Sequence, residues 1–509
     1  MNRTNAQFKT PAHDLGHAGL VDRADKTRLR ISPLLNAESR ANLGQFMTPG
    51  IIADFMASLF ESTKSDSVRI LDAGAGVGTL SAALITRITK EPMIASVDVT
   101  AYEIDQSIRT ELSKTLNHCA EADGRISSKI IPDDFIECAV NDIQFVGEGK
   151  FTHAILNPPY RKINVGTRHR KLLSEVGIET VNLYSAFVAL AIERMEQGGQ
   201  IVAIIPRSFC NGPYYRPFRK FMFRRAALKQ IHLFDSRTSA FSDDAVLQEN
   251  VIIRLTVGVQ QGDVIVSSSA DRSLTDSNRT SYSFKELVLS DDQEKFLHIP
   301  QNREKSLATH LPMATENLKD IGLNVSTGPV VDFRLKEFLL SEPATNSVPL
   351  LYANHFVKGT LVWPKTEGKK PNAIMLTVET LKWLYPNGCY TVLRRFSSKE
   401  EKRRIVAYVV RGTEFDTSRY LGFENHLNVF HNNRQPLKLE VALGLAVYLN
   451  STAVDEYFRR FSGHTQVNAT DLKNLKYPSH SALVELGNWA AKRDTISQEA
   501  IDSHIKNHV

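Results

Sequence analysis

Apolar runs alternate with helical patterns between residues 66 and 258 of the chain. The runs with the composition of buried strands lie at residues 68–71, 96–102, 129–131, 151–156, 199–206, 228–234 and 249–257. Stretches with helical spacing lie between several of them, as at residues 80–88, 106–122 and 182–195. Repeated strand–helix units predict a doubly wound α/β domain with a mostly parallel sheet, in which the last two strands pair as a hairpin-like edge.

The pattern changes beyond about residue 260, where loop-like serine-rich and polar segments are followed by short, irregular apolar runs without a repeated strand–helix unit. A chain of 509 residues also exceeds what one hydrophobic core usually supports. We therefore expect a leader at residues 1–38 that includes a short helix, a first domain at 39–260, a linker at 261–300 and an α+β domain at 301–509.

Composition limits the class of protein. With 42% hydrophobic and 23% charged residues it is typical of a soluble protein. The four cysteines lie far apart without a Cys-x-x-Cys or Cys/His pairing, which argues against a disulfide framework and structural zinc. The amino terminus lacks the apolar core of a signal peptide, and no apolar span has membrane length. We expect a cytoplasmic protein with no metal and no membrane contact.

The net charge of +6 suggests a polyanionic partner only weakly, but the cations are clustered. Residues 207–229 contain basic and aromatic residues and no acidic residue, and a second basic cluster spans residues 394–404. A further basic stretch begins at Arg161 and Lys162. Cations beside aromatic rings are typical of nucleic-acid binding, although a solvated helix face over buried phenylalanines gives the same pattern.

A glycine-rich loop, Asp72-Ala-Gly74-Ala-Gly76-Val-Gly78, follows the first predicted strand and precedes a helix. Glycines at such a turn let the backbone approach a nucleotide-like ligand closely. The loop is not Gly-x-Gly-x-x-Gly, and it lacks the lysine and the Ser/Thr of a phosphate-binding P-loop. Asp72 favours a ligand that is cationic or resembles an amino acid, and disfavours a pyrophosphate.

The next two strands also end in acidic residues. Glu103 follows the second strand, where α/β nucleotide sites bind ribose hydroxyls, and Asp134 with Phe135 follows the third, where they suit an adenine. A solvated turn at Glu103 and a helix cap at Asp134 are the alternatives. Thr48 and Pro49 open an earlier helix whose entry either packs in the core or lines a ligand pocket.

The segment Asn157-Pro158-Pro159-Tyr160 follows the strand at residues 151–156. Asn157 supplies a side-chain carbonyl, Pro158 a main-chain carbonyl and Tyr160 a flat face. Two acceptors and a stacking ring suit a planar amine, whose nitrogen lone pair they would aim at an electrophile, so that the segment favours amino-group methylation. The alternative is a proline-rich loop between a strand and a helix.

In this order, the motifs resemble those of the class I S-adenosylmethionine-dependent methyltransferases. Within them the chain is similar to the gamma class of DNA N6-adenine methyltransferases, the TaqI-like group, since Gly44-Gln45-Phe46-Met47-Thr48-Pro49 precedes the glycine loop. The segments that resemble the recognition half of PstI/BsuBI-type restriction-modification methyltransferases are His355-Phe356, Arg394-Arg395-Phe396-Ser397 and residues 463–468.

The resemblance implies a role for each motif. Asp72, Gly74, Gly76 and Gly78 would hold the methionine moiety of S-adenosylmethionine, and Glu103 its ribose. Asp134 and Phe135 would contact the adenine, Thr48, Pro49 and Asn157 would also touch the cofactor, and Asn157, Pro158 and Tyr160 would hold the target base. The cations expected at DNA are Arg161, Lys162, Arg216, Arg219, Arg394, Arg395, Arg403 and Arg404.

The implied partner is double-stranded DNA, read by the domain at 301–509, and a cognate restriction endonuclease would act on the same site without a stable complex. Two alternatives remain. Methyltransferases for rRNA adenine or guanine and for protein glutamine also use Asn-Pro-Pro-Tyr, but they are usually much shorter. A nucleic-acid-binding protein on a decayed methyltransferase fold would have lost Asn157 or the glycine loop, and both are intact here.

Overall fold

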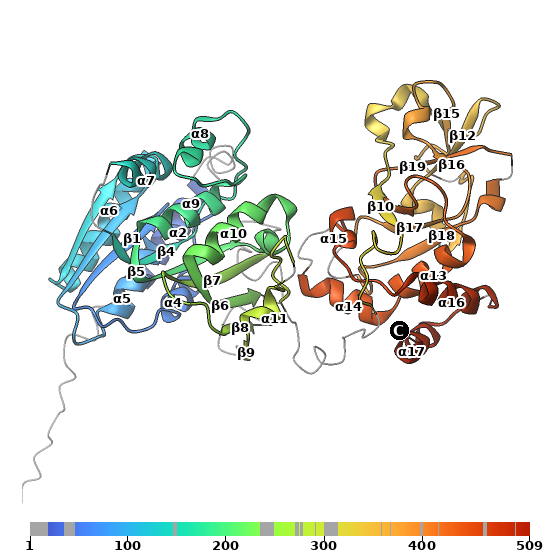
Figure 1. Ribbon diagram of the computed structural model, residues 1–509. Coiled ribbons are helices and arrows are strands. Elements are labelled where there is room, and N and C mark those ends of the chain that lie inside the picture. Colours follow the sequence, from blue (N-terminus) through green and yellow to red (C-terminus); the bar gives the residue numbers. More distant parts are fainter. Residues whose placement is uncertain are drawn as a thin grey trace, which may run out of the picture. The chain divides into compact units, whose positions relative to one another are not determined.

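The computed structural model describes residues 19–34, 46–145, 150–234, 249–269, 274, 278–290, 292–299, 314–357, 359–366, 368–397, 401–415, 417–461, 466–493 and 495–508. Gly44, Gln45 and residues 462–465 of the motifs above lie outside these ranges. The chain divides into two compact units, Met1–Ile299 and Pro300–Val509, and each is described by itself (Figure 1). None of the helices in these ranges is long and apolar enough to cross a membrane.

The first unit contains a nine-stranded sheet with the order β3-β2-β1-β4-β5-β7-β6-β8-β9. Its strands are β1 (Ser67–Ala73), β2 (Ser96–Tyr102), β3 (Ile126–Ile131), β4 (Phe151–Leu156), β5 (Met195–Pro206), β6 (Ala226–Phe234), β7 (Asn250–Val257), β8 (Val264–Ser269) and β9 (Asn278–Tyr282). Strands β3, β2, β1, β4 and β5 pair in parallel, and β7 is antiparallel to both β5 and β6. The carboxyl ends of the five parallel strands therefore share one edge of the sheet.

Helices cover both faces of this sheet (Figure 1). One core contains apolar side chains of α2 (Leu20–Ile31), α4 (Gly50–Ser58), α5 (Thr79–Ile88) and α6 (Gln106–Ala122). The other contains those of α7 (Phe135–Gln144), α8 (Arg168–Glu175), α9 (Leu183–Arg194) and α10 (Arg216–Arg225). Neighbours along β1 alternate between them, with Ile70 in the first core and Leu71 in the second. The predicted doubly wound α/β fold is confirmed.

Short elements complete the unit: α11 (Phe284–Leu287), η1 (Ser32–Leu34), η2 (Arg207–Cys210) and η3 (Pro213–Tyr215). The unit extends beyond residues 39–260, the bounds expected for the first domain. The expected linker at 261–300 contains β8, β9 and α11, and β8 extends the sheet by pairing in parallel with β6, so that β6 and β7 are not its edge. The expected leader at 1–38 contributes α2, whose Leu20, Val21 and Ala24 are buried in the core with α4 and α5.

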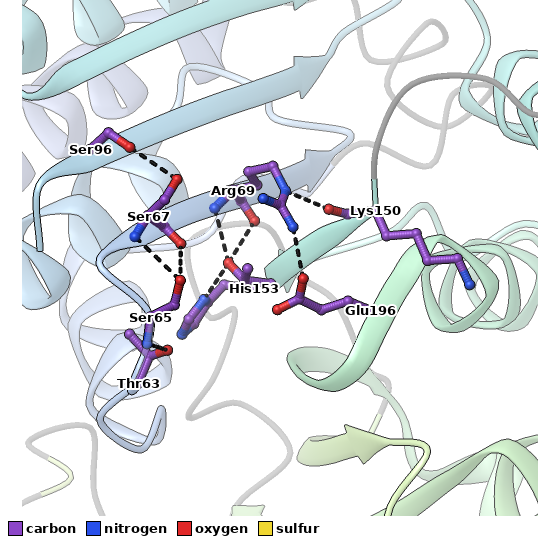
Figure 2. A network of polar contacts seen from close by, with 9 residues as sticks. Thr63, Ser65, Ser67, Arg69, Ser96, Lys150, His153 and Glu196 are labelled. Carbon is purple, nitrogen blue, oxygen red and sulfur yellow. Dashed lines mark hydrogen bonds and ion pairs between the residues drawn. The ribbon is translucent and has the colours of Figure 1, made fainter.

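Polar side chains connect the strands at the opposite, amino edge of the sheet (Figure 2). The Arg69 guanidinium donates from Nε to the Lys150 carbonyl at 2.6 Å and forms an ion pair with Glu196 at 2.7 Å. The Thr152 hydroxyl accepts from the Arg69 backbone at 2.9 Å and contacts the His153 ring. Burial lowers the pKa of His153 to about 4, so its ring is neutral at physiological pH. This network joins β1, β4 and β5 far from the carboxyl edge.

The second unit is built from short strands in three sheets and from carboxy-terminal helices. One sheet has the order β10-β20-β17-β18, from β10 (Asn324–Thr327), β20 (Leu427–His431), β17 (Tyr390–Arg394) and β18 (Ala407–Val410). A second has the order β11-β15-β12-β19-β16, from β11 (Leu339–Leu340), β15 (Ala373–Met375), β12 (Ser347–Leu351), β19 (Tyr420–Phe423) and β16 (Tyr385–Pro386). β13 (Phe356–Val357) pairs with β14 (Thr360–Leu361). Short 3₁₀ turns lie between them: η5 (Asp332–Arg334), η6 (Lys336–Phe338), η7 (Ala353–His355), η8 (Leu381–Trp383) and η9 (Gly412–Phe415).

The helices are α13 (Leu439–Leu449), α14 (Thr452–Phe461), α15 (Ala469–Lys473), α16 (His480–Ala491) and α17 (Gln498–His508). The α13 and α16 backbones touch at two glycines. A Cβ on Gly444 would lie 1.9 Å from the Leu483 carbonyl oxygen, and one on Gly487 would lie 1.7 Å from that of Glu440. Only residues without a side chain permit this crossing, which anchors the helices to the core around β17 and β20.

Candidate active site

A pocket lies at the carboxyl ends of the parallel strands. Its lining includes Phe46, Met47, Thr48, Gly74, Ala75, Gly76, Val77, Thr79, Leu80, Tyr102, Glu103, Ile104, Ile108, Asp133, Asp134, Phe135, Asn157, Pro159 and Phe187. The space between them, including the open mouth, measures about 860 Å³. Parallel strand order explains why residues from four separate motifs meet here.

The glycine loop forms the floor of this pocket. Gly74 and Ala75 donate backbone hydrogen bonds to the Tyr102 carbonyl, each at 2.9 Å. Gly76 donates to Glu103 Oε2 at 2.8 Å, and its φ of +55° is in the left-handed region that favours glycine. The loop is therefore tied to the end of β2 and presents its backbone to the pocket.

Glu103 is buried, with 5% of its surface exposed, yet it lines the pocket. Its Oε1 accepts the Asp105 N–H at 2.9 Å, opposite the bond from Gly76 to Oε2. Burial raises the pKa of Glu103, and these two N–H donors partly offset the rise. Because a carboxylate offers about four lone-pair sites, it retains acceptors for ligand hydroxyls.

Asp134 has two roles in the structure. Its Oδ1 caps α7 by accepting the N–H groups of Ile136 at 2.8 Å and Glu137 at 3.1 Å, as the cap alternative predicted. Its Oδ2 lies 3.1 Å from His169 Nε2, and the carboxylate also lines the pocket beside Phe135. Burial would raise the pKa of Asp134, but hydrogen bonding and the charge of His169 outweigh burial and lower it. The bond to Asp134 in turn raises the pKa of His169.

Asp72 lies behind the glycine loop rather than on the pocket wall. It is completely buried, and its Oδ2 accepts the Ser81 hydroxyl at 2.6 Å, while its Oδ1 has no hydrogen-bond partner among the residues that the structure describes. Burial raises its pKa to about 7. Gly78, also predicted at the ligand, faces α6 instead, since a Cβ there would lie 2.9 Å from Leu112. Neither residue is among those that line the pocket, and their contact with a ligand stays a prediction.

Asn157 is held from both ends of its amide. Its Nδ2 donates to the Phe46 carbonyl at 2.6 Å and to the Thr48 hydroxyl at 2.9 Å. Its Oδ1 accepts the Tyr160 hydroxyl at 3.1 Å, and that hydroxyl also lies 3.2 Å from the Ile204 carbonyl. The two acceptors at Nδ2 fix which end of the amide is the carbonyl. Oδ1 keeps a second lone pair for a ligand.

The rings and prolines around Asn157 stiffen the loop. Tyr160 is partly buried, with its ring centre 6.0 Å from that of Phe46 and 6.3 Å from that of Tyr184. Burial raises the pKa of the Tyr160 hydroxyl, which is therefore protonated at physiological pH. Pro158 is buried, and Pro49 caps the amino end of α4. Neither proline is part of the pocket wall described above, whereas Pro159 is.

The predicted DNA-binding cations differ in exposure. Arg161 and Lys162 are exposed directly after Tyr160. Arg219 and Arg404 are 0% and 1% exposed, which contradicts a DNA contact for either side chain. A buried charge is unfavourable unless it is hydrogen-bonded. Arg219 donates to the carbonyls of Phe209 and Gly212, each at 2.8 Å, and these bonds compensate for its burial.

The remaining four cations are partly exposed and bonded within their own units. Arg216 donates to the Gln293 carbonyl at 3.1 Å, and Arg394 forms an ion pair with Glu401. Arg395 donates to Gln466 Oε1 at 3.1 Å, and Arg403 to the Ser451 carbonyl at 2.9 Å. These bonds restrict the side chains without removing them from solvent.

Two further residues contribute to the site, and the sequence did not assign a role to either of them. Phe46 supplies the carbonyl that orients Asn157, and only its place in the Phe-Met-Thr-Pro entry indicated a role. His169 contacts Asp134 from α8, and nothing distinguishes it from its basic neighbours in the sequence. His355, by contrast, is 1% exposed and accepts the Tyr352 N–H at 3.2 Å, so its ring is structural.

Comparison with known proteins fits this geometry. Residues 79–241 match the Eco57I restriction-modification methylase family. The type II methyltransferase M.BsuBI of Bacillus subtilis is 49% identical over 494 residues, which cover 96% of this chain and 97% of that protein. The chain belongs to the type II restriction-modification methyltransferases. The predicted resemblance to the PstI/BsuBI branch is confirmed, since M.PstI of Providencia stuartii is 45% identical over 91% of the chain and 92% of its own length.

Solved structures extend the likeness to the fold of both units. The type IIL restriction-modification enzyme MmeI, in complex with DNA, matches with a TM-score of 0.51 and 10% identity over 98% of this chain and 74% of its own. A DrdV–DNA complex matches with a TM-score of 0.53 and 14% identity over 95% of this chain and 60% of its own. The first unit of this type II methyltransferase has the class I methyltransferase fold.

Proposed function

We propose that this type II methyltransferase transfers a methyl group from S-adenosylmethionine to the exocyclic N6 amine of an adenine in double-stranded DNA. The modification would protect host DNA from a cognate restriction endonuclease. Membership of the type II methyltransferase family supports methyl transfer. The observation that carries the amine assignment is the Asn157 amide, whose carbonyl oxygen is fixed at the pocket by donation from Nδ2 to Phe46 and Thr48.

The pocket residues suit S-adenosylmethionine. Glu103 would accept the ribose hydroxyls with its remaining lone pairs, and Asp134 would accept the adenine amine beside the Phe135 ring. Gly74 and Gly76 leave backbone exposed where the methionine part would lie. Asp72 would act on the cationic part through its field from behind the loop rather than by contact. When bound, the cofactor supplies a methyl group already activated on a sulfonium.

Asn157 would accept one hydrogen of the target amine at Oδ1, and the Pro158 carbonyl would accept the other. This keeps the nitrogen lone pair out of conjugation and directs it toward the methyl group. The sulfonium of the bound cofactor would supply the methyl group for the new N–C bond, and the amine nitrogen, held by these two acceptors, would lose its proton to water. The hydroxyl of Tyr160 is protonated, and its ring lies beside those of Phe46 and Tyr184. Tyr160 would therefore orient and stack on the target base rather than act as a base.

An adenine paired inside the duplex cannot reach this pocket, so the base would rotate out of the stack. The Tyr160 ring would stack on it and stabilise this state by about 1–3 kcal/mol. The basic residues Arg161 and Lys162 would contact the phosphates near the extruded base, because they are exposed directly after the catalytic loop.

The decisive variant is Asn157→Ala, with Asn164→Ala as a matched control because Asn164 is exposed in the segment that follows the loop. We expect Asn157→Ala to lower turnover on DNA by at least about 100-fold, since orientation supplies most of the catalysis. Its affinity for S-adenosylmethionine by calorimetry should stay within a few-fold of the wild type. Asn164→Ala should behave as the wild type in both measurements.

Near-normal turnover in Asn157→Ala would overturn the role of this side chain. Labelled S-adenosylmethionine should be offered with duplex DNA, rRNA and a glutamine-containing release factor in parallel. Transfer to RNA or protein, and none to DNA, would overturn the substrate assignment while leaving the cofactor site intact.

A further inference from the structure

Three loops of the second unit meet at the end of the sheet that contains β17 and β20. The Arg395 backbone N–H donates to the His426 carbonyl at 2.8 Å, and the Arg395 carbonyl accepts the Val467 N–H at 2.7 Å. Asn428 Nδ2 donates to the Val467 carbonyl at 2.7 Å. Segments that lie far apart in the sequence therefore form one surface, which we call the His426 cluster: Arg395, Phe396, His426 and Gln466.

His426 is held in a single orientation by a buried carboxylate. Glu424 is 0% exposed, and it accepts both the His426 backbone N–H at 2.9 Å and the ring N–H at Nδ1. The ring packs on Phe396, with 4.8 Å between ring centres. The side chain is nevertheless 40% exposed, and its Nε2 has no hydrogen bond within the part of the chain that the structure describes. One polar ring atom is thus fixed and directed to solvent.

Such an arrangement needs a reason, because a buried carboxylate is unfavourable unless it is fully paired. A surface histidine that served only solubility would gain nothing from a buried partner. The same device is found where an imidazole must present one defined nitrogen to a ligand, since the bond at one ring nitrogen sets the role of the other. Glu424 is therefore a positioning residue for His426.

Hydrogen bonds also hold Arg395, a neighbour of His426 in the cluster. Arg395 donates from Nη1 to the Asn425 carbonyl at 3.2 Å and from Nη2 to Gln466 Oε1 at 3.1 Å. Its Nε is buried and has no hydrogen-bond partner among the described residues, so only the outer edge of the guanidinium can meet a ligand. Phe396 is 42% exposed, although it is a large apolar side chain. On base edges in a DNA groove, the planar cation matches hydrogen-bond acceptors and the exposed ring matches the thymine methyl group. With Nδ1 donating to Glu424, Nε2 of a neutral imidazole is an acceptor and matches the exocyclic amines of adenine and cytosine.

We infer that the His426 cluster reads base edges of the DNA target site, with His426 Nε2 as a specificity-determining contact. The inference rests on the proposed function, because that function supplies DNA as the ligand. A phosphate contact would need only a flexible cation, whereas base readout needs the fixed direction that Glu424 and Phe396 impose on the ring. The cluster would thus choose the site that the first unit methylates.

The test begins with the full-length wild type and a pool of randomised DNA duplexes, whose methylated members are sequenced to define the preferred site. His426→Ala and Phe396→Ala are then compared with His480→Ala, which removes an exposed histidine at the start of α16. Methylation rates are measured on the preferred site and on each of its single base-pair variants. Affinity for an unrelated duplex is measured across salt concentrations.

We expect His426→Ala to reduce discrimination about tenfold at one base-pair position and to leave the other positions unchanged. Phe396→Ala should weaken discrimination at the same position, because it removes the phenyl ring on which the His426 imidazole packs. For both variants, the salt dependence of affinity for the unrelated duplex should match that of the wild type. His480→Ala should match the wild type in every measurement.

Unchanged discrimination at all positions in both variants would overturn the inference. So would an equal loss on all sequences with a shallower salt dependence, because that result identifies a phosphate contact. A wild type that modifies RNA or protein and not DNA would overturn the proposed function and this inference together. A wild type that methylates DNA without sequence preference would overturn only the inference.

Discussion

The two units position polar side chains by different means. In the first, Gly76, Glu103, Asp134 and Asn157 each follow a parallel strand, and the topology of the sheet places them at one edge. In the second, Arg395 and His426 lie beside the ends of the antiparallel strands β17 and β20, whereas Gln466 comes from the segment between α14 and α15. A parallel sheet therefore assembles its site by a general rule, whereas the second unit assembles one by particular loop contacts.

This difference has an energetic side. The first unit places its acidic groups under backbone N–H donors, as with Gly76 and Asp105 at Glu103, so the site is stabilised by the fold itself. In the second unit the loops depend on the packing of the small sheets against α13 and α16. We expect the site of the first unit to keep its structure when the second unit is destabilised. The His426 cluster should lose its structure together with the second unit.

The largest effect should come from Gly487→Ala, since the new Cβ would lie 1.7 Å from the Glu440 carbonyl oxygen. Separating α13 from α16 should destabilise the second unit by about 3 kcal/mol. Hydrogen exchange should rise across β17, β20 and α13, while affinity for S-adenosylmethionine stays close to that of the wild type. Gly124→Ala, with open space around the added atom, is the control. If affinity for S-adenosylmethionine fell together with the stability of the second unit, the first site would depend on the second unit, contrary to this expectation.

Asp72→Asn tests the buried charge of the first unit. The folded pKa of Asp72, about 7, lies above its ordinary value of 3.8, so between these pH values the folded state binds more protons than the unfolded state. Stability contributed by the protonated group is therefore lost as pH rises through this window, and the loss is complete above about pH 7. The variant should lack this loss and gain Tm relative to the wild type between pH 5 and 8. A difference in Tm that is independent of pH would contradict the shift.

His169→Ala should have a smaller effect, because the pair with Asp134 is partly exposed. The bond raises the pKa of His169, so its contribution is fully present below about pH 6.5 and is lost as pH rises through the higher folded value. We expect a loss of about 0.5–1 kcal/mol at pH 6 that diminishes by pH 9, measured by urea unfolding. Arg168→Ala, which breaks the ion pair with Glu137, is the control without a titration in this range. A pH-independent loss in His169→Ala would refute the assignment.

The smallest effect should come from Lys162→Ala. If Lys162 contacts one phosphate, its removal should reduce the slope of log affinity against log salt by about 1 on any duplex, without changing site preference. Lys64→Ala is the control, because Lys64 is exposed before β1 at the other edge of the sheet. An altered preference among sequences would move base readout from the second unit into the first.

The sequence predicted that these motifs would meet, because each motif is local and the strand order of a doubly wound sheet brings the motifs together. Periodicity could not show that Asp72 lies behind the loop, since that depends on the packing of α5, where the Ser81 hydroxyl donates to Asp72 Oδ2. Nor could charge clustering distinguish Lys162, exposed beside the loop, from Arg219, which is folded into the unit as a donor to backbone carbonyls. Exposure is a property of tertiary packing.

For the second unit, the sequence indicated several polar loops without showing which of them meet. The contact between Arg395 and Gln466 spans 71 positions and follows from strand pairing that short, irregular apolar runs do not reveal. The cluster around His426 therefore became visible only in three dimensions.

The central claim is that the exocyclic amine of adenine in DNA receives the methyl group. Its most direct test is mass spectrometry of nucleosides from duplex DNA that the wild type has modified with isotope-labelled S-adenosylmethionine. We expect the label in N6-methyladenine, and none when Asn157→Ala replaces the wild type. Label in a methylated cytosine, or in N6-methyladenine at undiminished yield with the Asn157→Ala variant, would contradict the claim.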